Sequence, residues 1–321
     1  MVLACLLPTL ATTLQAQAVS TPYPSRDVQI VVPNEPGGGL DLVARLLARD
    51  LGPRLNASFS VINRSGASGN VGTASVARAA PDGHTLLLTG VGHVASPLLH
   101  AQPGYDPLKD FVPVATVAMA PSVWMVHTSV TAAGVPQLLA DPRSASGGMS
   151  FASAGFGHSS HLAAELVKDK ARARWLHVPY RGTGPASRAL VAGEVQMMFM
   201  PAGSVQSVLA TGRARALAVA SPHRLRSLPE VPTLAEQGMS DAAFSQWYAL
   251  LAPTGTPPEV QQALHGAVRA ILDEPGLRGQ FAAMGLEPLS LGRDELRPFM
   301  ASQQRQIEAL LRRAAVQRPV D

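Results

Sequence analysis

The 321-residue sequence has a single cysteine, Cys5, and it lies in an uncharged N-terminal stretch, residues 1–18. The apolar run over residues 2–14 is too short to span a bilayer, and the Ala-Gln-Ala at 16–18 is typical of signal-peptide cleavage. We therefore expect an exported protein that is cleaved after Ala18. A lipid-attachment box is the alternative, but the cysteine would then precede the main apolar run. Cleavage would leave no thiol, which excludes disulfides, a thiol nucleophile and a cysteine metal site.

Charge is also sparse. Charged residues make up 15% of the sequence and aromatic residues 5%, and the net charge of +4 comes almost entirely from arginines scattered singly and in pairs. A long basic run, or a basic stripe interleaved with aromatics, is absent from the sequence, so a nucleic-acid partner is not indicated. The apolar content of 46% is enough for the cores of a globular protein of about two domains.

A glycine-rich segment at residues 33–41, Pro-Asn-Glu-Pro-Gly-Gly-Gly-Leu-Asp, joins a strand-like run at 28–32 to a periodic helix that begins near Asp41. It lacks the Gly-Lys-Ser/Thr ending of a nucleotide P-loop and the G-x-G-x-x-G spacing, which disfavours nucleotide binding. Glycines leave backbone amides accessible, and the unpaired N–H groups of a helix N-terminus favour a carboxylate or phosphate. The segment is therefore predicted to bind a small anion.

Strand-like and helix-like segments alternate along the chain after residue 22, which predicts an α/β protein with helices on both faces of a sheet. The order of the opening motif, strand, loop of small residues and helix, starts again near residue 149. We expect strands at 28–33, 59–63, 85–89, 112–119, 123–127, 149–153, 175–178, 195–200, 217–220 and 246–252. We expect helices at 42–51, 66–80, 159–169, 185–192, 257–273 and 293–315.

This repetition predicts two α/β lobes. We place lobe 1 at residues 22–124 plus 247–321, and lobe 2 at residues 125–246. The chain would then cross between the lobes twice, near 124 and near 246, which makes a two-strand hinge about which the lobes can close.

Several motifs stand in collinear order over the whole mature chain. They are Tyr-Pro-Ser-Arg at 23–26, Pro-Gly-Gly-Gly-x-Asp at 36–41, Asn-Arg-Ser-Gly-Ala-Ser-Gly-Asn at 63–70, Ala-Ala-Pro-Asp-Gly at 79–83, Tyr-Asp-Pro-Leu-Lys-Asp-Phe at 105–111, Ser-Ser-His at 159–161, His-Val-Pro-Tyr-Arg-Gly at 177–182 and Leu-Leu-Ala-Pro-Thr-Gly-Thr-Pro at 250–257. Each motif is weak alone, but together they resemble the Bug family, the extracytoplasmic solute receptors of tripartite tricarboxylate transporters.

The resemblance implies a two-lobed periplasmic-binding-protein fold, of the type II-like or Venus flytrap kind, that closes around one small organic acid. It implies a receptor in the periplasm and not an enzyme, with no cofactor and no metal. The expected protein is a monomer that presents its ligand to integral-membrane transporter subunits or to a sensor.

In the family that this chain resembles, the ligand carboxylate is held between two βα loops, which here are residues 34–41 and 153–161. The predicted contacts of these loops are Asn34, Glu35, Gly38, Gly39, Leu40, Asp41, Ser153, Ala154, Gly155, His158, Ser159, Ser160 and His161. Because α/β folds bind ligands outside the carboxyl ends of strands, we add Gly90, His93, Tyr180, Arg181 and Met200. Arg181 either pairs with a second ligand carboxylate or lies on the surface, and for His93 the role of a satisfied structural histidine is favoured over that of a ligand contact.

Some positions depart from the family pattern. Asn34 and Glu35 stand where the family commonly has an aromatic residue and a proline, and a carboxylate at the lip of the loop would repel an anion by about 1–4 kcal/mol unless it faces solvent. Met200 replaces an acidic residue, and His158 replaces a small polar one. These differences favour a small carboxylate of aromatic or amphipathic character over a dicarboxylate or a tricarboxylate such as citrate.

A periplasmic hydrolase that uses Ser159 and His161 is the alternative function. The surrounding Gly-His-Ser-Ser-His sequence is not the G-x-S-x-G nucleophile elbow, and serines at a helix start are ordinary N-caps. His158 and His161 are three residues apart, but no third metal ligand stands at a recognisable spacing from them. An orphan receptor without a dedicated transporter is a further possibility.

Overall fold

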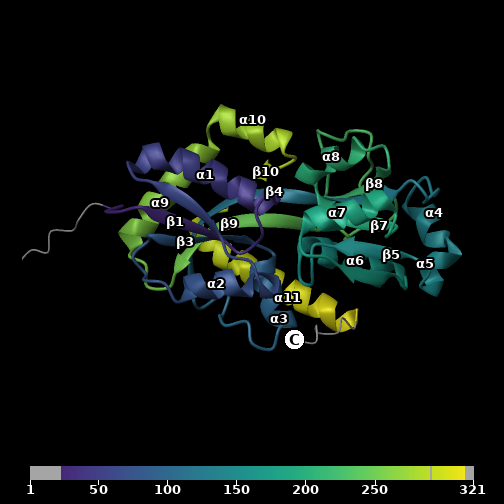
Figure 1. Ribbon diagram of the computed structural model, residues 1–321, viewed down its shortest axis with the longest axis horizontal. Coiled ribbons are helices and arrows are strands. Elements are labelled where there is room, and N and C mark those ends of the chain that lie inside the picture. The colour runs from purple at the N-terminus through teal and green to yellow at the C-terminus, as the bar shows by residue number, and fades with distance from the viewer. Residues whose placement is uncertain (1–22, 290, 315–321) are drawn as a thin grey trace, which may run out of the picture.

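The computed structural model describes residues 23–289 and 291–314, which form two α/β lobes side by side (Figure 1). The expected signal peptide and its cleavage site lie outside the described residues. Each helix within the described ranges is too short or too polar to cross a membrane.

Lobe 1 is built on a mixed sheet with the strand order β2-β1-β3-β9-β4, in which β1, β2 and β3 are parallel and β9 is antiparallel to its neighbours. Its strands are β1 (Val28–Val32), β2 (Phe59–Asn63), β3 (Thr85–Gly90), β9 (Ser245–Pro253), β10 (Glu287–Pro288) and the first part of β4 (Phe111–His127). Its helices are α1 (Gly39–Leu55), α2 (Asn70–Ala77), α3 (Gly92–Leu99), α9 (Pro258–Leu272), α10 (Pro275–Ala283) and α11 (Arg293–Arg313), with a 3-10 turn η1 (Ala67–Gly69).

Successive side chains of the lobe-1 strands point to opposite faces of the sheet, and an apolar core lies on each face. Ile30 packs with the apolar faces of α1, α9 and α10, whereas its neighbour Val31 packs with α2, α3 and α11. Figure 1 shows these two groups of helices above and below the sheet. The carboxyl ends of β1 and β3 therefore emerge between two helical layers, at the side that faces lobe 2.

Lobe 2 repeats this plan with the strand order β8-β4-β7-β5-β6, in which β5 is parallel to both β6 and β7. Its strands are β5 (Ser150–Ser153), β6 (Leu176–Pro179), β7 (Met197–Pro201), β8 (Ala214–Ala220) and the second part of β4. Its helices are α4 (Val135–Ala140), α5 (Pro142–Ser146), α6 (Ser159–Ala171), α7 (Thr183–Ala192) and α8 (Val205–Leu209), with a 3-10 turn η2 (Ala202–Ser204). Met197 faces the core under α4 and α6, and Met198 faces the core under α7 and α8.

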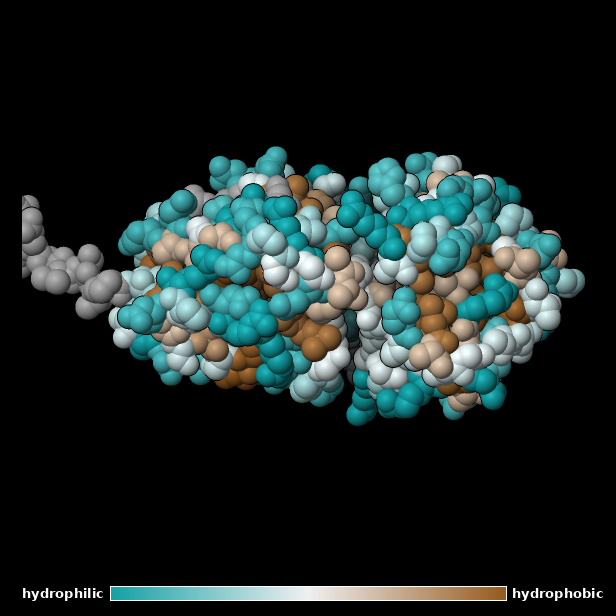
Figure 2. Space-filling view, turned by 90° about the horizontal axis from the view of Figure 1, so that it is seen from above, coloured by the Kyte–Doolittle hydropathy of each residue, from teal (hydrophilic) through white to brown (hydrophobic). Residues whose placement is uncertain are grey.

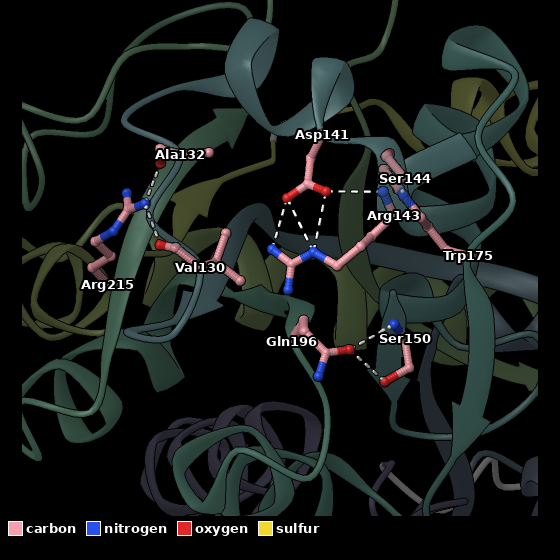
Figure 3. A network of polar contacts seen from close by, with 9 residues as sticks. All are labelled: Val130, Ala132, Asp141, Arg143, Ser144, Ser150, Trp175, Gln196 and Arg215. Carbon is pink, nitrogen blue, oxygen red and sulfur yellow. Dashed lines mark hydrogen bonds and ion pairs between the residues drawn. The ribbon is translucent and has the colours of Figure 1, made fainter. Parts of the chain in front are cut away.

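The end of lobe 2 farthest from lobe 1 is held by polar side chains (Figure 3). The indole N–H of Trp175 donates to the Ser144 hydroxyl at 2.8 Å, and the guanidinium of Arg215 donates to the carbonyl of Val130 at 3.1 Å. The first bond ties α5 to the start of β6, and the second ties the segment before α4 to β8.

The two lobes are connected by β4 and β9, which confirms the two-lobed fold with a two-strand hinge. We predicted two separate strands where the structure has one strand of 17 residues, β4. It pairs with β9 as far as Pro121 and with β7 and β8 from Ser122 onward. Pro121 does not end the strand because it stands where β4 changes partners, and a missing N–H donor is tolerated there. The exact lobe boundaries at 124/125 and 246/247 stay a prediction.

The lobes also touch along one side of the molecule. Leu162 of α6 is fully buried in the core formed by α3, α11 and β9, and Asp169 of α6 accepts from Arg313 of α11 at 3.1 Å. At Gly157 a side-chain Cβ would stand 2.9 Å from Leu99 of α3. The loop before α6 is therefore pressed against lobe 1.

Candidate functional site

A cavity of about 1190 Å³ separates the lobes and is lined from both sides. Lobe 1 contributes the N-terminal ends of α1 and α3 and the η1 turn, and lobe 2 contributes the N-terminal ends of α6 and α7 and the η2–α8 segment. Figure 2 shows the groove between the lobes in a view from above. The volume exceeds the 300–1,000 Å³ common for small-molecule pockets, as an open cleft between two lobes would.

The lobe-1 loop after β1 is fixed by a buried carboxylate. Asp41 accepts from the backbone N–H of Gly37 at 3.0 Å and from the Asn63 amide at 3.0 Å, and it pairs with Arg45. Burial alone would raise the pKa of Asp41, but the bonds from Arg45, Gly37 and Asn63 outweigh it and hold the pKa below its usual value. The backbone N–H groups of Gly39 and of its successor in α1 have no acceptor among the described residues. They are available to an anion.

The lobe-2 loop after β5 has the same plan. Its own amides are occupied: Ala154 donates to the Ser160 hydroxyl at 2.9 Å, Gly155 to the Ser153 hydroxyl at 3.1 Å, and Gly157 to Nδ1 of His161 at 3.2 Å. By contrast, the first N–H groups of α6 have no acceptor in the described part of the chain. The helix dipole adds attraction for an anion, typically about 0.3–1 kcal/mol.

Three histidines support this loop. His161 and His177 are stacked with ring centroids 4.2 Å apart, and Nε2 of His177 lies 2.6 Å from the Ser153 hydroxyl. Burial lowers the pKa of His158 and of His177 to about 4, with Lys168 adding to the shift of His177. Burial, followed by the neighbouring basic groups, also holds the pKa of His161 well below its usual value. All three rings are thus neutral at neutral pH, so the attraction that this loop offers to an anion comes from backbone amides and not from imidazolium charge.

The hydrolase arrangement is not assembled. Nδ1 of His161 is occupied by the Gly157 amide, and no hydrogen bond joins His161 to Ser159 in the described residues. The serine–histidine contact that does form joins Ser153 to His177 beneath the loop. Across residues 23–289 and 291–314, no group of three or more His, Cys, Asp or Glu side chains is placed to hold a metal ion.

Fourteen of the predicted contact residues line the cavity: Asn34, Glu35, Gly38, Gly39, Leu40, Gly90, His93, Ala154, Gly155, His158, Ser159, Ser160, Tyr180 and Arg181. Asp41, Ser153 and His161 do not line it and lie beneath the two loops, whose backbone they bond. The placement of Met200 at the pocket is wrong, because it is fully buried between β7 and the helices α7 and α8. The strand runs one residue further, and Pro201 lines the cavity instead.

Sequence reasoning missed the hinge strand as a wall of the cavity. Gln246 and Tyr248 of β9 both line it. The Tyr248 hydroxyl has no hydrogen-bond partner among the described residues, and a Cβ at Gly39 would lie 2.7 Å from it. Burial raises the pKa of Tyr248 above its usual value, so the phenol stays protonated. Gln246 and Tyr248 are two residues apart in a strand and therefore point to the same face, and this spacing could have indicated a polar wall of the cavity.

Three charged side chains stand at the rim of the cavity. On lobe 1 Glu35 is exposed and accepts a hydrogen bond from the Ser65 hydroxyl in the loop after β2, which holds it on its own lobe. On lobe 2 Arg181 and Arg188 are exposed, and neither has an acceptor in the described part of the chain. The mouth is therefore acidic on one side and basic on the other.

Two α/β lobes, two connecting strands and a cleft between opposed helix N-termini define a two-lobed solute-binding protein. The chain belongs to the tripartite tricarboxylate transporter family of receptors, whose family model matches residues 43–316. The predicted membership of the Bug family is thereby confirmed.

Solved structures of relatives agree. The periplasmic binding protein BugD is 32% identical, with 92% of this chain and 99% of that chain covered and a TM-score of 0.84. An R. palustris protein solved with adipate is 30% identical, with 91% and 98% covered and a TM-score of 0.86. MatC from Rhodopseudomonas palustris, solved with bound malate, is 30% identical, with 90% and 100% covered and a TM-score of 0.83.

Proposed function

We propose that this protein captures a small organic carboxylate between its lobes and delivers it to a tripartite tricarboxylate-type transporter. The observation that carries the proposal is the pair of helix N-termini, α1 and α6, whose unpaired amides line the same cavity from opposite lobes. A carboxylate has two oxygens and can accept from both sides, so its binding would hold the lobes together. The adipate and malate complexes of the two R. palustris relatives support this ligand class.

The ligand is bound and released unchanged. The neutral, occupied His161 and the absence of a Ser159–His161 bond in the described residues argue against a hydrolase. We further propose that the protein acts as a periplasmic monomer after removal of its signal peptide, with integral-membrane transporter subunits or a sensor as its partner.

The far end of the ligand would lie near the rim. Arg181 is free to pair with a second carboxylate, whereas Glu35 on the opposite lobe would repel one and attract a cationic or donor group. A ligand whose second carboxylate points towards lobe 2 would pair with Arg181 and stay away from Glu35. The Tyr248 hydroxyl is a candidate hydrogen-bond partner on the cavity wall.

Calorimetry with a panel of mono- and dicarboxylates tests the proposal, together with mass spectrometry of whatever co-purifies with the native protein. We expect saturable 1:1 binding of at least one carboxylate that is recovered intact. Gly38→Asp gives a sharp control, because a Cβ at Gly38 meets no atom within 4 Å, so the added carboxylate can occupy the cavity at little cost to folding. It should abolish binding. Turnover of an ester or amide that is lost in Ser159→Ala would overturn the receptor assignment.

A further inference from the structure

The two anion-binding loops are fixed by equivalent bonds. In lobe 1 the amide of Gly37 donates to the carboxylate of Asp41, four residues later, at 3.0 Å. In lobe 2 the amide of Gly157 donates to Nδ1 of His161, again four residues later, at 3.2 Å. Asp41 and His161 are each the third residue of their helix, α1 and α6. The same position thus closes the same turn in both lobes.

The chemistry of the two acceptors differs. The carboxylate of Asp41 stays an acceptor at any pH near neutrality, because its pKa is held below the usual value by its hydrogen bonds even though burial works against it. The imidazole of His161 accepts at Nδ1 only while that nitrogen carries no proton, since a protonated ring has two donors and no acceptor. A proton on His161 therefore removes the acceptor of the Gly157 amide and leaves that amide unpaired.

The surroundings of His161 offer little stabilisation to a positive charge on its ring. The ring is 1% exposed, stacked on His177 and set edge-on against Phe156 with centroids 5.4 Å apart. The basic groups that face it are His158, His177 and Lys168. Lys168 is paired at 3.0 Å with Glu165 on the same helix.

The elements packed against α6 add little further charge. At the far end of the helix, Arg313 of α11 pairs with Asp169 at 3.1 Å. Beside Gly157 in the loop before α6, the nearest atoms of α3 belong to Leu99, Ala95 and the backbone of Ser96, and none of them is charged. An imidazolium at His161 would thus meet mostly basic or apolar groups.

We propose that His161 is a positioning residue of the binding site, which as a neutral imidazole holds the lobe-2 loop in its anion-binding form and releases that loop when it is protonated. His177 supports it by stacking and by fixing Ser153, whose hydroxyl accepts from the Gly155 amide. The lobe-1 loop keeps its Gly37–Asp41 bond on acidification, so protonation releases only the lobe-2 loop. The inference rests on the proposed function in that both loops hold one carboxylate.

Linkage sets the size of the effect. Between the ordinary histidine pKa of 6.5 and the lowered value in the closed loop, His161 carries one more proton in the open loop than in the closed one. The opening equilibrium of the loop should then rise about tenfold for each pH unit below 6.5. Loss of the acceptor at any pH leaves the buried Gly157 amide unsatisfied. This should raise the opening equilibrium of the loop by about 5- to 150-fold.

Two variants separate the acceptor from the ring. His161→Asn keeps an acceptor at the position where Asp41 shows that a short side chain reaches, but it does not titrate. His161→Phe keeps an aromatic ring against His177 and has no acceptor. His223→Asn, an exposed histidine that is not among the residues lining the cavity, is the matched surface control.

Amide hydrogen exchange of the segment 155–158 is measured from pH 7.5 to pH 5 without ligand, and the dissociation constant of the best carboxylate is measured over the same range. After correction for intrinsic exchange rates, we expect loop opening to rise at least about tenfold per pH unit in the wild type and in His223→Asn. In His161→Asn the dependence should be shallower by about tenfold per pH unit, because His158 and His177 still titrate there as they do in the wild type, and in His161→Phe opening should be high throughout. At pH 7.5 His161→Asn should bind within about threefold of the wild type, and His161→Phe at least about fivefold more weakly.

Equal pH dependence of loop opening in the wild type and His161→Asn would overturn the inference, as would wild-type affinity in His161→Phe. Binding that tightens on acidification in the wild type but not in His161→Asn would also overturn it. If no carboxylate binds the wild type, the proposed function fails, but the exchange measurement still decides the role of His161. Thermal unfolding of each variant shows whether a loss of binding is only a loss of folding.

Discussion

His93 should make the protein less stable in acid, and the size of the loss follows from its burial. The side chain is 1% exposed, its Nε2 donates to the Pro107 carbonyl at 2.9 Å, and it packs against the rings of Tyr105 and Phe111. Burial lowers its pKa from 6.5 to about 4, against smaller opposing effects of the Pro107 carbonyl and Asp106. Between these two values the unfolded chain binds a proton that the native state does not.

Because the native pKa is depressed, the contribution of His93 is fully present above pH 6.5 and is lost as the pH falls towards 4. With these pKa values, His93 alone should cost about 2 kcal/mol of unfolding free energy between pH 7.5 and pH 5. His93→Gln keeps an N–H donor for Pro107 and removes the titration. Its lost ring contacts lower the stability equally at every pH.

Urea unfolding at pH 7.5, 6.5, 5.5 and 5.0 measures this difference. The wild type should be the more stable form at pH 7.5, and its advantage over His93→Gln should shrink by about 2 kcal/mol at pH 5. His158, His161 and His177 titrate in both proteins and cancel in the comparison. An advantage that is the same at all four pH values would refute the assignment of His93 as a neutral buried histidine.

Three further outcomes are expected. Gly157→Ala should destabilise the protein by about 1–3 kcal/mol more than Gly238→Ala in chemical unfolding. Both glycines have positive φ, but only a Cβ at Gly157 would meet the other lobe. Equal losses would mean that the interlobe contact adjusts to the added methyl group without cost. Glu35→Gln should strengthen binding of a dicarboxylate by roughly two- to fivefold in calorimetry at low salt, and an unchanged affinity would show that this carboxylate faces away from the ligand. Tyr248→Phe should weaken ligand binding by roughly two- to tenfold with little change in thermal stability, whereas unaltered binding would remove its hydroxyl from the site.

Much of the site was predictable because its signals are local. A strand, a loop of small residues and a helix start are written consecutively in the sequence at 28–42 and again at 149–162, and both loops line the cavity. Strand alternation likewise assigns Met197 and Met198 to opposite faces, as observed. Local periodicity specifies such elements without knowledge of their partners.

What was missed depends on contacts between distant residues. The helix α3 was not expected because Pro97 lies inside it and cannot donate to the carbonyl of His93. The Tyr105 hydroxyl donates to that carbonyl instead, at 3.0 Å. In the same way, Tyr248 enters the site only because β9 is placed between β3 and β4. Neither fact is encoded in neighbouring residues.

The continuous strand β4 has a consequence for how the molecule folds. Its backbone ladder passes from the β9 partner in one lobe to the β7 and β8 partners in the other without a break. Neither lobe can be excised without cutting a central strand and leaving apolar sheet edges bare. The two lobes should therefore melt in one cooperative transition, although each has its own cores.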